Sequence, residues 1–354
     1  MDKNTRALLL EHYRHYPKLQ AEDIFKYLYQ SSFGCEHLIS NEERVLGYIK
    51  REYESLTVQP SMTDKLDGTY TRIHLSALKG GLTPETLARL FFLSAKKETD
   101  GKSALESKLS AARELIKEGL LPLDLNDFDK KLSDWRKSGY PAIHHSDAFR
   151  SKYRPAYRVI ADRYAEFLAL FTEIDKLLSE GSAIVTLEGG SASGKSTLAE
   201  VLCEVYDCNV FHADDFFLRP EQRTPERFAE IGGNLDRERF YDEIILPLTR
   251  NESVVYQRFN CGTQKFEPPV TVSPKKLTVV EGAYSMHPAF GRYSDLAVFL
   301  DIDPEYQKKR ILIRNTPQFA ERFFNEWIPL EKRYFEGTEI KKRSDLIIPI
   351  NDKI

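Results

Sequence analysis

The segment from Gly189 to Ser196 is the part of the chain whose residue types and spacing point most directly to chemistry. It reads Gly189, Gly190, Ser191, Ala192, Ser193, Gly194, Lys195 and Ser196, which fits the pattern G-x-x-x-x-G-K-[ST] without a mismatch. Glycines let the backbone turn tightly and aim its N–H groups at a nucleotide phosphate. The lysine would reach the β- and γ-phosphates, and the serine hydroxyl would ligate Mg²⁺. The alternative is a glycine- and serine-rich turn with a chance lysine.

Two adjacent carboxylates, Asp214 and Asp215, directly follow an apolar run, Val210 to Ala213, that we expect to be a strand. Carboxylates at the carboxyl end of a strand in a doubly wound sheet face the ligand crevice. A kinase needs a carboxylate there to orient the acceptor hydroxyl and accept its proton. The alternative is a solvated pair that caps the next helix.

The phosphate-binding pattern alone leaves a GTPase, a motor and a small-molecule kinase open. No Asn-Lys-x-Asp segment, which a GTPase would use to read its base, follows the loop. The carboxylate pair therefore favours a kinase.

Further segments make the second half of the chain resemble the uridine kinase and phosphoribulokinase family of P-loop kinases. The matching segments are Gly189 to Thr197, Asp214-Asp215-Phe216-Phe217, Asn234-Leu235-Asp236 with Tyr241-Asp242, Leu277 to Gly282, and the pair Arg310 and Arg314. The resemblance covers residues 183 to 350, about half of the chain, and it adds Thr197 to the expected ATP-binding residues.

The resemblance implies a role for each matching polar residue. Asp214 would be the general base, and Asp236 would hold an acceptor hydroxyl. Glu281 would orient Mg²⁺ through water, together with Ser196. Arg310 and Arg314 would join Lys195 in neutralising charge on the transferring phosphoryl group. The alternative for Glu281 is a surface charge at the end of a strand. The alternative for the two arginines is a solvated helix face.

The segments that read a pyrimidine in this family depart from the pattern. In the stretch that begins at Val254, Tyr256 is retained, whereas Gln257 and Cys261 stand where the family has Asp and His. Tyr256 and Arg258 remain candidate substrate contacts. Tyr284 and His287 follow the Glu281-Gly282 segment and would lie beside the site, although packing explains them equally well.

The elements that must position these residues form an alternating pattern after residue 180. Short apolar runs at 183–187, 210–211, 253–256, 277–280, 296–300 and 346–350 read as strands, and helical stretches at 195–206, 304–315 and 317–335 lie between them. This alternation predicts an α/β fold: a P-loop kinase domain, residues 180–354, with a doubly wound, mostly parallel sheet. Residues 1–179 show helical spacing, including 157–178, and no clear strand. We therefore expect an all-helical N-terminal domain of unknown role.

The N-terminal half contains one segment, 140–158, that is rich in histidine, arginine and tyrosine. Arg150, Arg154 and Arg158 recur at four-residue spacing, and we hypothesise that they bind a phosphorylated or other anionic ligand. The alternatives are a solvated surface turn, a metal site from His144, His145 and Asp147, or an RNA-binding patch. Cys35 beside His37 suggests a nucleophile pair only weakly, because neighbours in sequence need not meet in space.

Composition limits the remaining function classes. The chain has 354 residues, with 51 Lys and Arg against 54 Asp and Glu, a formal net charge of −3. This balance gives no global attraction to nucleic acid or to anionic membranes. No apolar run is long enough for a signal peptide or a membrane span, and the four cysteines form no Cys-x-x-Cys pair. We expect a cytoplasmic protein.

Together these features predict a kinase that uses ATP and Mg²⁺ to phosphorylate the hydroxyl of a small molecule, with a nucleoside such as uridine as the first candidate. The alternatives are a kinase for a non-nucleoside alcohol and a nucleotide-dependent regulatory or RNA-binding protein. The preference for ATP over GTP, and whether the chain forms a homo-oligomer, are left open by the sequence.

Overall fold

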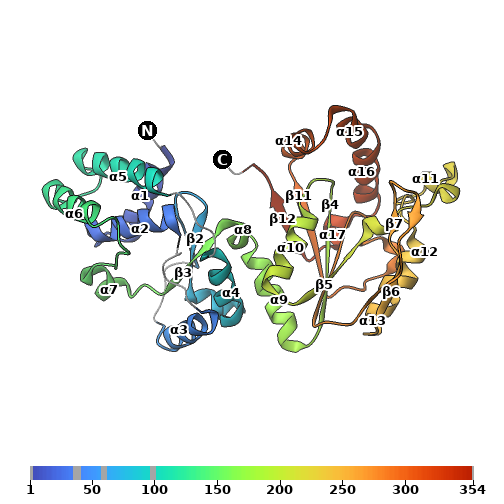
Figure 1. The fold of residues 1–354 in the computed structure, drawn as a ribbon, viewed down its shortest axis with the longest axis horizontal. Coiled ribbons are helices and arrows are strands. Elements are labelled where there is room, and N and C mark those ends of the chain that lie inside the picture. Colours follow the sequence, from blue (N-terminus) through green and yellow to red (C-terminus); the bar gives the residue numbers. More distant parts are fainter. Residues whose placement is uncertain (1–2, 35–40, 57–61, 96–100, 353–354) are drawn as a thin grey trace. The chain divides into compact units, whose positions relative to one another are not determined.

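A computed structural model describes residues 3–34, 41–56, 62–95 and 101–352, and the chain divides into two compact units, 1–175 and 176–354 (Figure 1). The division and the boundary expected from the sequence at residues 179–180 both fall within one helix, α9 (Leu168–Glu180).

Unit 1 is built mainly of helices. They are α1 (Lys3–His15), α2 (Ala21–Phe33), α3 (Glu42–Glu54), η2 (Leu75–Gly80), α4 (Pro84–Ala95), α5 (Lys102–Lys117), α6 (Leu125–Lys137), α7 (Asp147–Tyr153), α8 (Asp162–Ala165) and the first part of α9. The start of α4 follows from local sequence, because Pro84 takes the first helical position and the Thr83 hydroxyl accepts a hydrogen bond from Thr86 N at 3.1 Å.

Unit 1 also contains a three-stranded antiparallel sheet, so it is not all-helical. Its strands are β1 (Thr63–Lys65), β2 (Tyr70–His74) and β3 (Tyr157–Ala161), in the order β1-β2-β3. The register pairs Ile73 with Arg158, residues far apart in the chain, and all of β2 is buried. The spacing of apolar residues after Tyr157 resembled a helix, but pairing with a distant strand outweighs local preference.

Unit 2 has a five-stranded parallel sheet at its centre. The strands are β4 (Ala183–Gly189), β5 (Cys208–His212), β10 (Leu277–Glu281), β11 (Leu296–Ile302) and β12 (Leu346–Ile350), in the order β12-β11-β4-β10-β5. Five of the six runs expected to be strands are in this sheet. The run at 253–256 instead forms β6 (Val254–Tyr256), which pairs with β9 (Val270–Val272), while β7 (Phe259–Asn260) pairs with β8 (Lys265–Phe266).

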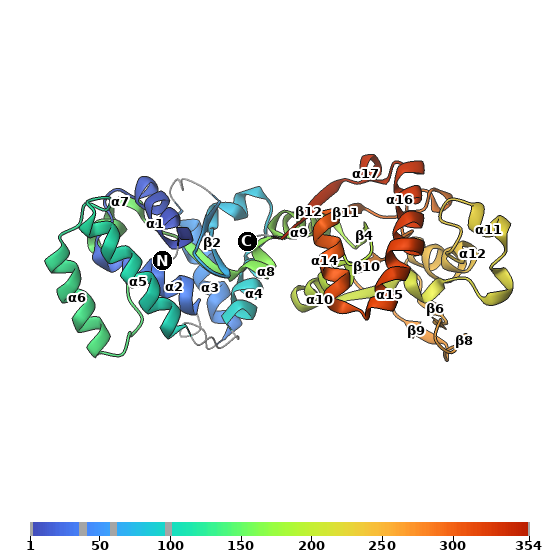
Figure 2. The ribbon, with the colours of Figure 1, turned by 90° about the horizontal axis from the view of Figure 1, so that it is seen from above.

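Helices flank this sheet (Figures 1 and 2). The helices of unit 2 after α9 are α10 (Lys195–Val205), η3 (Ala213–Phe216), η4 (Pro220–Gln222), α11 (Pro225–Ala229), α12 (Arg237–Phe240), the π-helix η5 (Tyr241–Ile245), α13 (Leu246–Thr249), η6 (Pro288–Phe290), α14 (Pro304–Arg314), α15 (Pro317–Arg322), the π-helix η7 (Phe323–Trp327), α16 (Ile328–Gly337) and α17 (Ile340–Arg343). The helices expected at 195–206, 304–315 and 317–335 are present as α10, α14 and the run α15–η7–α16.

The alignment of β10 with its two neighbours places the chemistry of unit 2. Glu281, the last residue of β10, lies opposite Leu187 on one side and His212 on the other. Gly282 follows with φ of 138°, and a Cβ there would lie 2.6 Å from the Cβ of Ala213. Only glycine fits this close approach, which keeps the ends of β10 and β5 together.

Among the described residues, no helix is both long and apolar enough to cross a membrane. The three described cysteines, Cys203, Cys208 and Cys261, are free thiols. The Sγ atoms of Cys203 and Cys208 lie 2.7 Å apart without a covalent bond.

We predict that Asp175→Ala lowers the free energy of unfolding of unit 1 by about 1–3 kcal/mol, because buried donors lose their acceptor. The Asp175 carboxylate accepts from Thr83 N at 2.7 Å, Thr83 Oγ1 at 2.9 Å and Thr86 Oγ1 at 2.8 Å, which ties the start of α4 to α9. Urea denaturation followed by circular dichroism measures the change, with exposed Glu180→Ala on the same helix as control. Equal stability of the two variants would contradict the prediction.

Candidate active site

The loop from Gly189 to Ser196 joins β4 to α10, as the sequence predicted. Gly194 precedes α10 with φ of 100°, a backbone conformation that side chains rarely adopt. Lys195 Nζ donates to the carbonyl oxygens of Gly189 at 2.9 Å and Gly190 at 3.1 Å. Its ammonium group is therefore held over the loop, while the side chains of Ser196 and Thr197 are exposed at the start of the helix.

A hydrogen-bond chain links this loop to the neighbouring strands. The Ser196 hydroxyl donates to Glu281 Oε1 at 3.0 Å, and His212 Nδ1 lies 2.6 Å from the same oxygen. Glu281 is only 4% exposed. The structure thus brings together Ser196 and Glu281, the two residues expected to hold Mg²⁺. It adds His212, which the sequence indicated only as part of a strand.

Within this hydrogen-bond chain, Glu281 and His212 shift each other's pKa. Burial opposes ionisation of Glu281, but the hydrogen bond from His212 and the charge of Lys195 outweigh it and hold its pKa below the ordinary value. In turn, the hydrogen bond to Glu281 raises the pKa of His212, against the effect of burial. A carboxylate that stays ionised at the end of a buried strand suits a cation site.

Asp214 and Asp215 lie just beyond His212, at the start of η3. Asp214 is open to solvent, but protein surrounds it closely enough for desolvation to raise its pKa; Lys195 opposes this shift and Glu281 adds to it. Asp215 is half-buried, and its Oδ2 lies 3.4 Å from Nε of Arg258. Burial also raises the pKa of Asp215, against the charge of Arg258. Of the two, Asp214 is the accessible carboxylate with a raised proton affinity.

Ser191 is fastened to two helices from the end of the chain. Its N–H and hydroxyl donate to the Glu331 carboxylate of α16 at 2.9 and 2.5 Å, and its carbonyl accepts from Gln307 Nε2 of α14 at 2.8 Å. Glu331 and Gln307 are both buried. The sequence analysis missed both residues, because they lie more than one hundred positions after Ser191 and belong to no local motif.

Glu188, the residue before the loop, was also missed. It is completely buried and accepts hydrogen bonds from the backbone N–H groups of Gly189 at 3.2 Å, Tyr284 at 3.1 Å and Met286 at 3.1 Å. The Tyr334 hydroxyl donates to it at 3.1 Å. Burial raises its pKa to about 7. The sequence does contain one indication of Glu188, because it is a single acidic residue at the end of an apolar strand.

Arg310 and Arg314 lie on α14 with different surroundings. A Cβ at Gly194 would lie 3.5 Å from Nη1 of Arg310, so this guanidinium is beside the phosphate loop. Arg314, one turn further, is exposed at the helix end. The structure therefore places the Arg310 guanidinium near Gly194 and leaves Arg314 on the surface.

Asp236 and Tyr256, two expected substrate contacts, are buried and already engaged. Asp236 is 1% exposed, caps α12 through Arg239 N at 3.3 Å, and accepts from Gln222 Nε2 at 3.0 Å. Tyr256 is 3% exposed and packs in the core, with its ring 6.0 Å from that of Phe216. In this structure neither side chain is open to a substrate.

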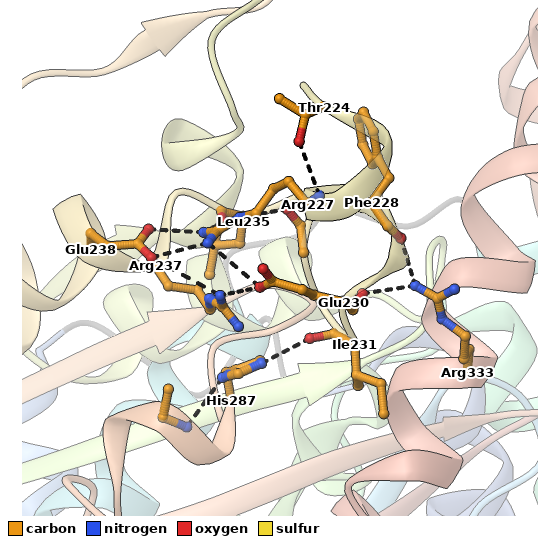
Figure 3. Close-up of polar contacts among 12 residues, drawn as sticks. Thr224, Arg227, Phe228, Glu230, Ile231, Leu235, Arg237, Glu238, His287 and Arg333 are labelled. Carbon is orange, nitrogen blue, oxygen red and sulfur yellow. Dashed lines mark hydrogen bonds and ion pairs between the residues drawn. The ribbon is translucent and has the colours of Figure 1, made fainter. Parts of the chain in front are cut away.

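The segment around α11 is pinned to the rest of unit 2 (Figure 3). Arg333 of α16 donates to the carbonyl oxygens of Phe228 at 2.8 Å and Glu230 at 2.7 Å, and His287 Nε2 lies 3.0 Å from the Ile231 carbonyl oxygen. Arg227 pairs with Glu238 at 2.8 Å. His287 is therefore buried and hydrogen-bonded to the segment that follows α11.

The cations of the 140–158 segment are partly neutralised within unit 1. Arg158 makes a two-armed ion pair with Glu52 at 3.0 and 3.1 Å, and Arg150 pairs with Asp147 at 2.5 Å. His145 is buried and His144 exposed, so they face different surroundings. No cluster of three potential metal ligands occurs among the residues that the structure describes. Cys35 and His37 lie outside the described residues.

No family model and no curated protein matches this chain. Among solved structures, a possible uridine kinase from Bacillus stearothermophilus is 22% identical, with a TM-score of 0.39, over 51% of this chain and 99% of its own. A fructose transport system kinase from a Silicibacter species is 18% identical, with a TM-score of 0.35, over 47% and 89%. Shikimate kinase from Bacteroides thetaiotaomicron is 11% identical, with a TM-score of 0.27, over 48% and 86%.

Unit 2 has the fold of a P-loop kinase. The observations that show this fold are the parallel five-stranded sheet, the phosphate loop between β4 and α10, and the flanking helices. Each of these structures is similar to about half of this chain, the share for which the sequence indicated a resemblance to uridine kinase-like proteins.

We predict that Glu281→Gln lowers the pKa of His212. The Glu281 carboxylate raises this pKa, whereas burial lowers it, so removal of the negative charge leaves burial as the main effect. Titration of the His212 ring protons by nuclear magnetic resonance measures the shift. Glu336→Gln, an exposed carboxylate on α16, is the matched control and should leave the pKa of His212 unchanged. An equal pKa in both variants would show that Glu281 does not set the protonation of His212.

Proposed function

We propose that unit 2 is a phosphotransferase that uses ATP and Mg²⁺ to phosphorylate a hydroxyl group of a small molecule. The observation that carries this proposal is the meeting of three features at one edge of the sheet. These are the phosphate loop with Lys195, the Ser196–Glu281 pair, and the accessible Asp214 with a raised pKa. A nucleotide-dependent switch would need only the phosphate loop and the Ser196–Glu281 pair. Asp214 is needed in addition when a hydroxyl group is phosphorylated, because a base must accept its proton.

Each of these residues has a role that its surroundings support. The loop N–H groups and Lys195 would bind the β- and γ-phosphates, and Arg310 would neutralise charge beside the loop at Gly194. Asp214 would orient the acceptor hydroxyl and accept its proton. Because desolvation already favours the protonated form of Asp214, the proton transfer costs less there than at a fully hydrated carboxylate.

The residues present fit a magnesium ion held mainly by the nucleotide. Mg²⁺ usually takes one or two protein oxygen ligands and keeps several waters and phosphate oxygens. The Ser196 hydroxyl and the ionised Glu281 carboxylate provide this kind of donor set. When bound, the ion would neutralise charge on the phosphate oxygens.

We further propose that the acceptor is a non-nucleoside alcohol rather than uridine. Asp236 and Tyr256, which the resemblance assigned to the sugar and the base, are buried and hydrogen-bonded or packed within the protein. Arg258 is exposed and lies beside Asp215, so it is the retained candidate for contact with a substrate. An acceptor with an anionic group would suit this arginine.

The regulatory or RNA-binding alternative has less support, because Arg150 and Arg158 are paired with carboxylates in unit 1. We propose the cytoplasm as the compartment, since the reaction uses ATP and the described thiols are free. Release of ADP, screened across nucleosides, sugars, sugar acids and amino-acid alcohols, tests the function. Release that depends on one acceptor class supports a kinase, whereas ADP release that no acceptor stimulates contradicts it.

We predict that Lys195→Ala abolishes acceptor-dependent ADP release while the fold is kept. Lys195 is the cation held over the phosphate loop, and its removal takes away the contact to the transferring phosphate. Steady-state kinetics and circular dichroism measure the two properties. The exposed Lys308→Ala on α14 serves as control. Full activity in a folded Lys195→Ala protein would rule out the proposed site.

We predict that Asp214→Asn lowers kcat by about 10²–10⁴-fold, the usual cost of losing a general base, with little change in ATP affinity. The neighbouring Asp215→Asn is the matched comparison, because Asp215 is half-buried and lies beside Arg258. We expect the Asp215 variant to change KM for the acceptor more than kcat. If Asp215→Asn lost turnover and Asp214→Asn kept it, the general base would be Asp215.

A further inference from the structure

The interior of unit 1 contains a cluster of polar side chains that the proposed kinase does not use. They come from α1, α2, β2 and the segment that follows α6, and each is less than 9% exposed. They are His12, Asp23, Gln30, Arg72, His74 and His145. Buried ionisable groups cost folding free energy unless they are fully paired. Their pairing therefore shows whether the cluster serves the fold alone.

The first carboxylate of the cluster, Asp23, is fully satisfied. It accepts from Gln20 N at 2.8 Å, from Ser146 N at 3.0 Å and Oγ at 2.6 Å, and from His145 Nδ1 at 2.8 Å. Burial would raise the pKa of Asp23, but these hydrogen bonds outweigh it and lower the pKa. Burial lowers the pKa of His145 to about 4, so the ring is neutral, donates from Nδ1 and accepts from Tyr157 OH at 2.7 Å.

A second carboxylate, Asp64 of β1, borders the cluster and is satisfied as well. It accepts from Tyr16 OH at 2.9 Å, and His74 Nε2 lies 2.9 Å from the same oxygen. Burial opposes its ionisation, but His74 and the charge of Arg72 outweigh that effect and hold the pKa of Asp64 far below the ordinary value. Neither carboxylate forms a hydrogen bond to Arg72 among the described contacts.

In contrast to the two carboxylates, the hydrogen-bond donors of Arg72 are not all paired. Arg72 is 1% exposed and donates from Nε to Gln30 Oε1 at 2.9 Å. Its Nη2 is buried and has no hydrogen-bond partner in the described part of the chain. The guanidinium lies over two aromatic rings, 5.2 Å from the centroid of Tyr27 and 4.6 Å from that of Tyr157. It is therefore held rigidly with one donor group unpaired.

Nε2 of His12 and Nζ of Lys26 can each form further hydrogen bonds. Nε2 of His12 is buried without a partner in the described residues, and its ring lies 4.4 Å from that of Tyr27. Lys26 Nζ, with three hydrogens, donates to the Ile143 carbonyl oxygen at 3.0 Å. Burial, and then the charge of Arg72, lower the pKa of Lys26 to about 8. Lys26 is half-buried and connects the cluster with the surface.

A guanidinium and an ammonium can only donate hydrogen bonds, so the missing partner must be an acceptor. Two nearby positive charges, with both carboxylates already committed, favour an acceptor that is negatively charged. We propose that this cluster is an oxyanion-binding site, in which Arg72 and Lys26 hold the carboxylate or phosphate group of a small molecule and His12 contacts it. The site is distinct from the nucleotide site of unit 2 and does not depend on the function proposed for that unit.

A purely structural reading competes with this proposal: a trapped water molecule could satisfy Arg72 and His12. The two readings differ in their response to anions and in what Lys26 contributes. A structural network gains nothing from added anions. An oxyanion site is stabilised when its ligand binds, and its buried cations reduce the stability of the empty protein.

The experiment uses the full chain carrying Lys195→Ala, so that the phosphate loop does not hold the probe. Inorganic phosphate and acetate are titrated separately, and amide hydrogen exchange is followed by mass spectrometry in peptides from α1, α2 and β2. We expect exchange in these peptides to slow by up to about tenfold when the anion is at ten times its Kd. Protection by phosphate alone or by acetate alone distinguishes a phosphate-bearing from a carboxylate-bearing ligand. No protection by either anion would overturn the proposal.

A second variant separates binding from folding. Lys26→Met, added to Lys195→Ala, keeps the apolar stem and removes the charge. We expect an equal or higher Tm and at least tenfold weaker anion protection. The matched control is Lys50→Met, which removes a half-exposed lysine paired with Glu85 at 2.7 Å and should keep the protection. A lower Tm for Lys26→Met with unchanged protection would show that Lys26 serves the fold and not an anion.

Discussion

The parallel alignment of β4, β10 and β5 is the constraint on which the candidate active site depends. It places Glu281 opposite His212 on one side and next to the strand that leads into the phosphate loop on the other. The absence of a side chain at Gly282 allows the strand ends to approach this closely. Ser196, Glu281 and His212 can then share one hydrogen-bond chain, which no single element could supply.

The phosphate loop depends equally on residues that carry no recognisable motif. Glu331 and Gln307 hold Ser191 from α16 and α14, and Tyr334, one turn after Glu331, holds the buried Glu188. A backbone that must present several N–H groups to a phosphate loses affinity if it is disordered beforehand. These contacts fix the first half of the loop through the helices that follow it in the fold, so α16 is part of the site although none of its residues was expected there.

The sequence was sufficient where local patterns determine structure. The loop at 189–196, the strand and helix alternation after residue 180 and the start of α4 each depend on residues close together in the chain. It was insufficient where distant segments decide. The pairing of Ile73 with Arg158 makes the first residues of the helix expected at 157–178 into β3, while α8 and α9 follow it. Glu331 reaches Ser191 across more than one hundred residues. The exposure of Asp214 and the burial of Asp236 also depend on tertiary packing, which residue type alone does not reveal.

The two units use buried charge in opposite ways. In unit 2 the buried carboxylates Glu188 and Glu331 each receive several hydrogen bonds, and they leave the N–H groups at the start of α10 for a ligand. In unit 1 the carboxylates Asp23 and Asp64 are also satisfied, and Nη2 of Arg72 and Nε2 of His12 are among the buried polar atoms left without a partner in the described residues. Because an unpaired buried donor costs roughly 1–3 kcal/mol, such groups persist where a ligand or water completes them. An oxyanion is the chemical group that would complete the donors of each unit.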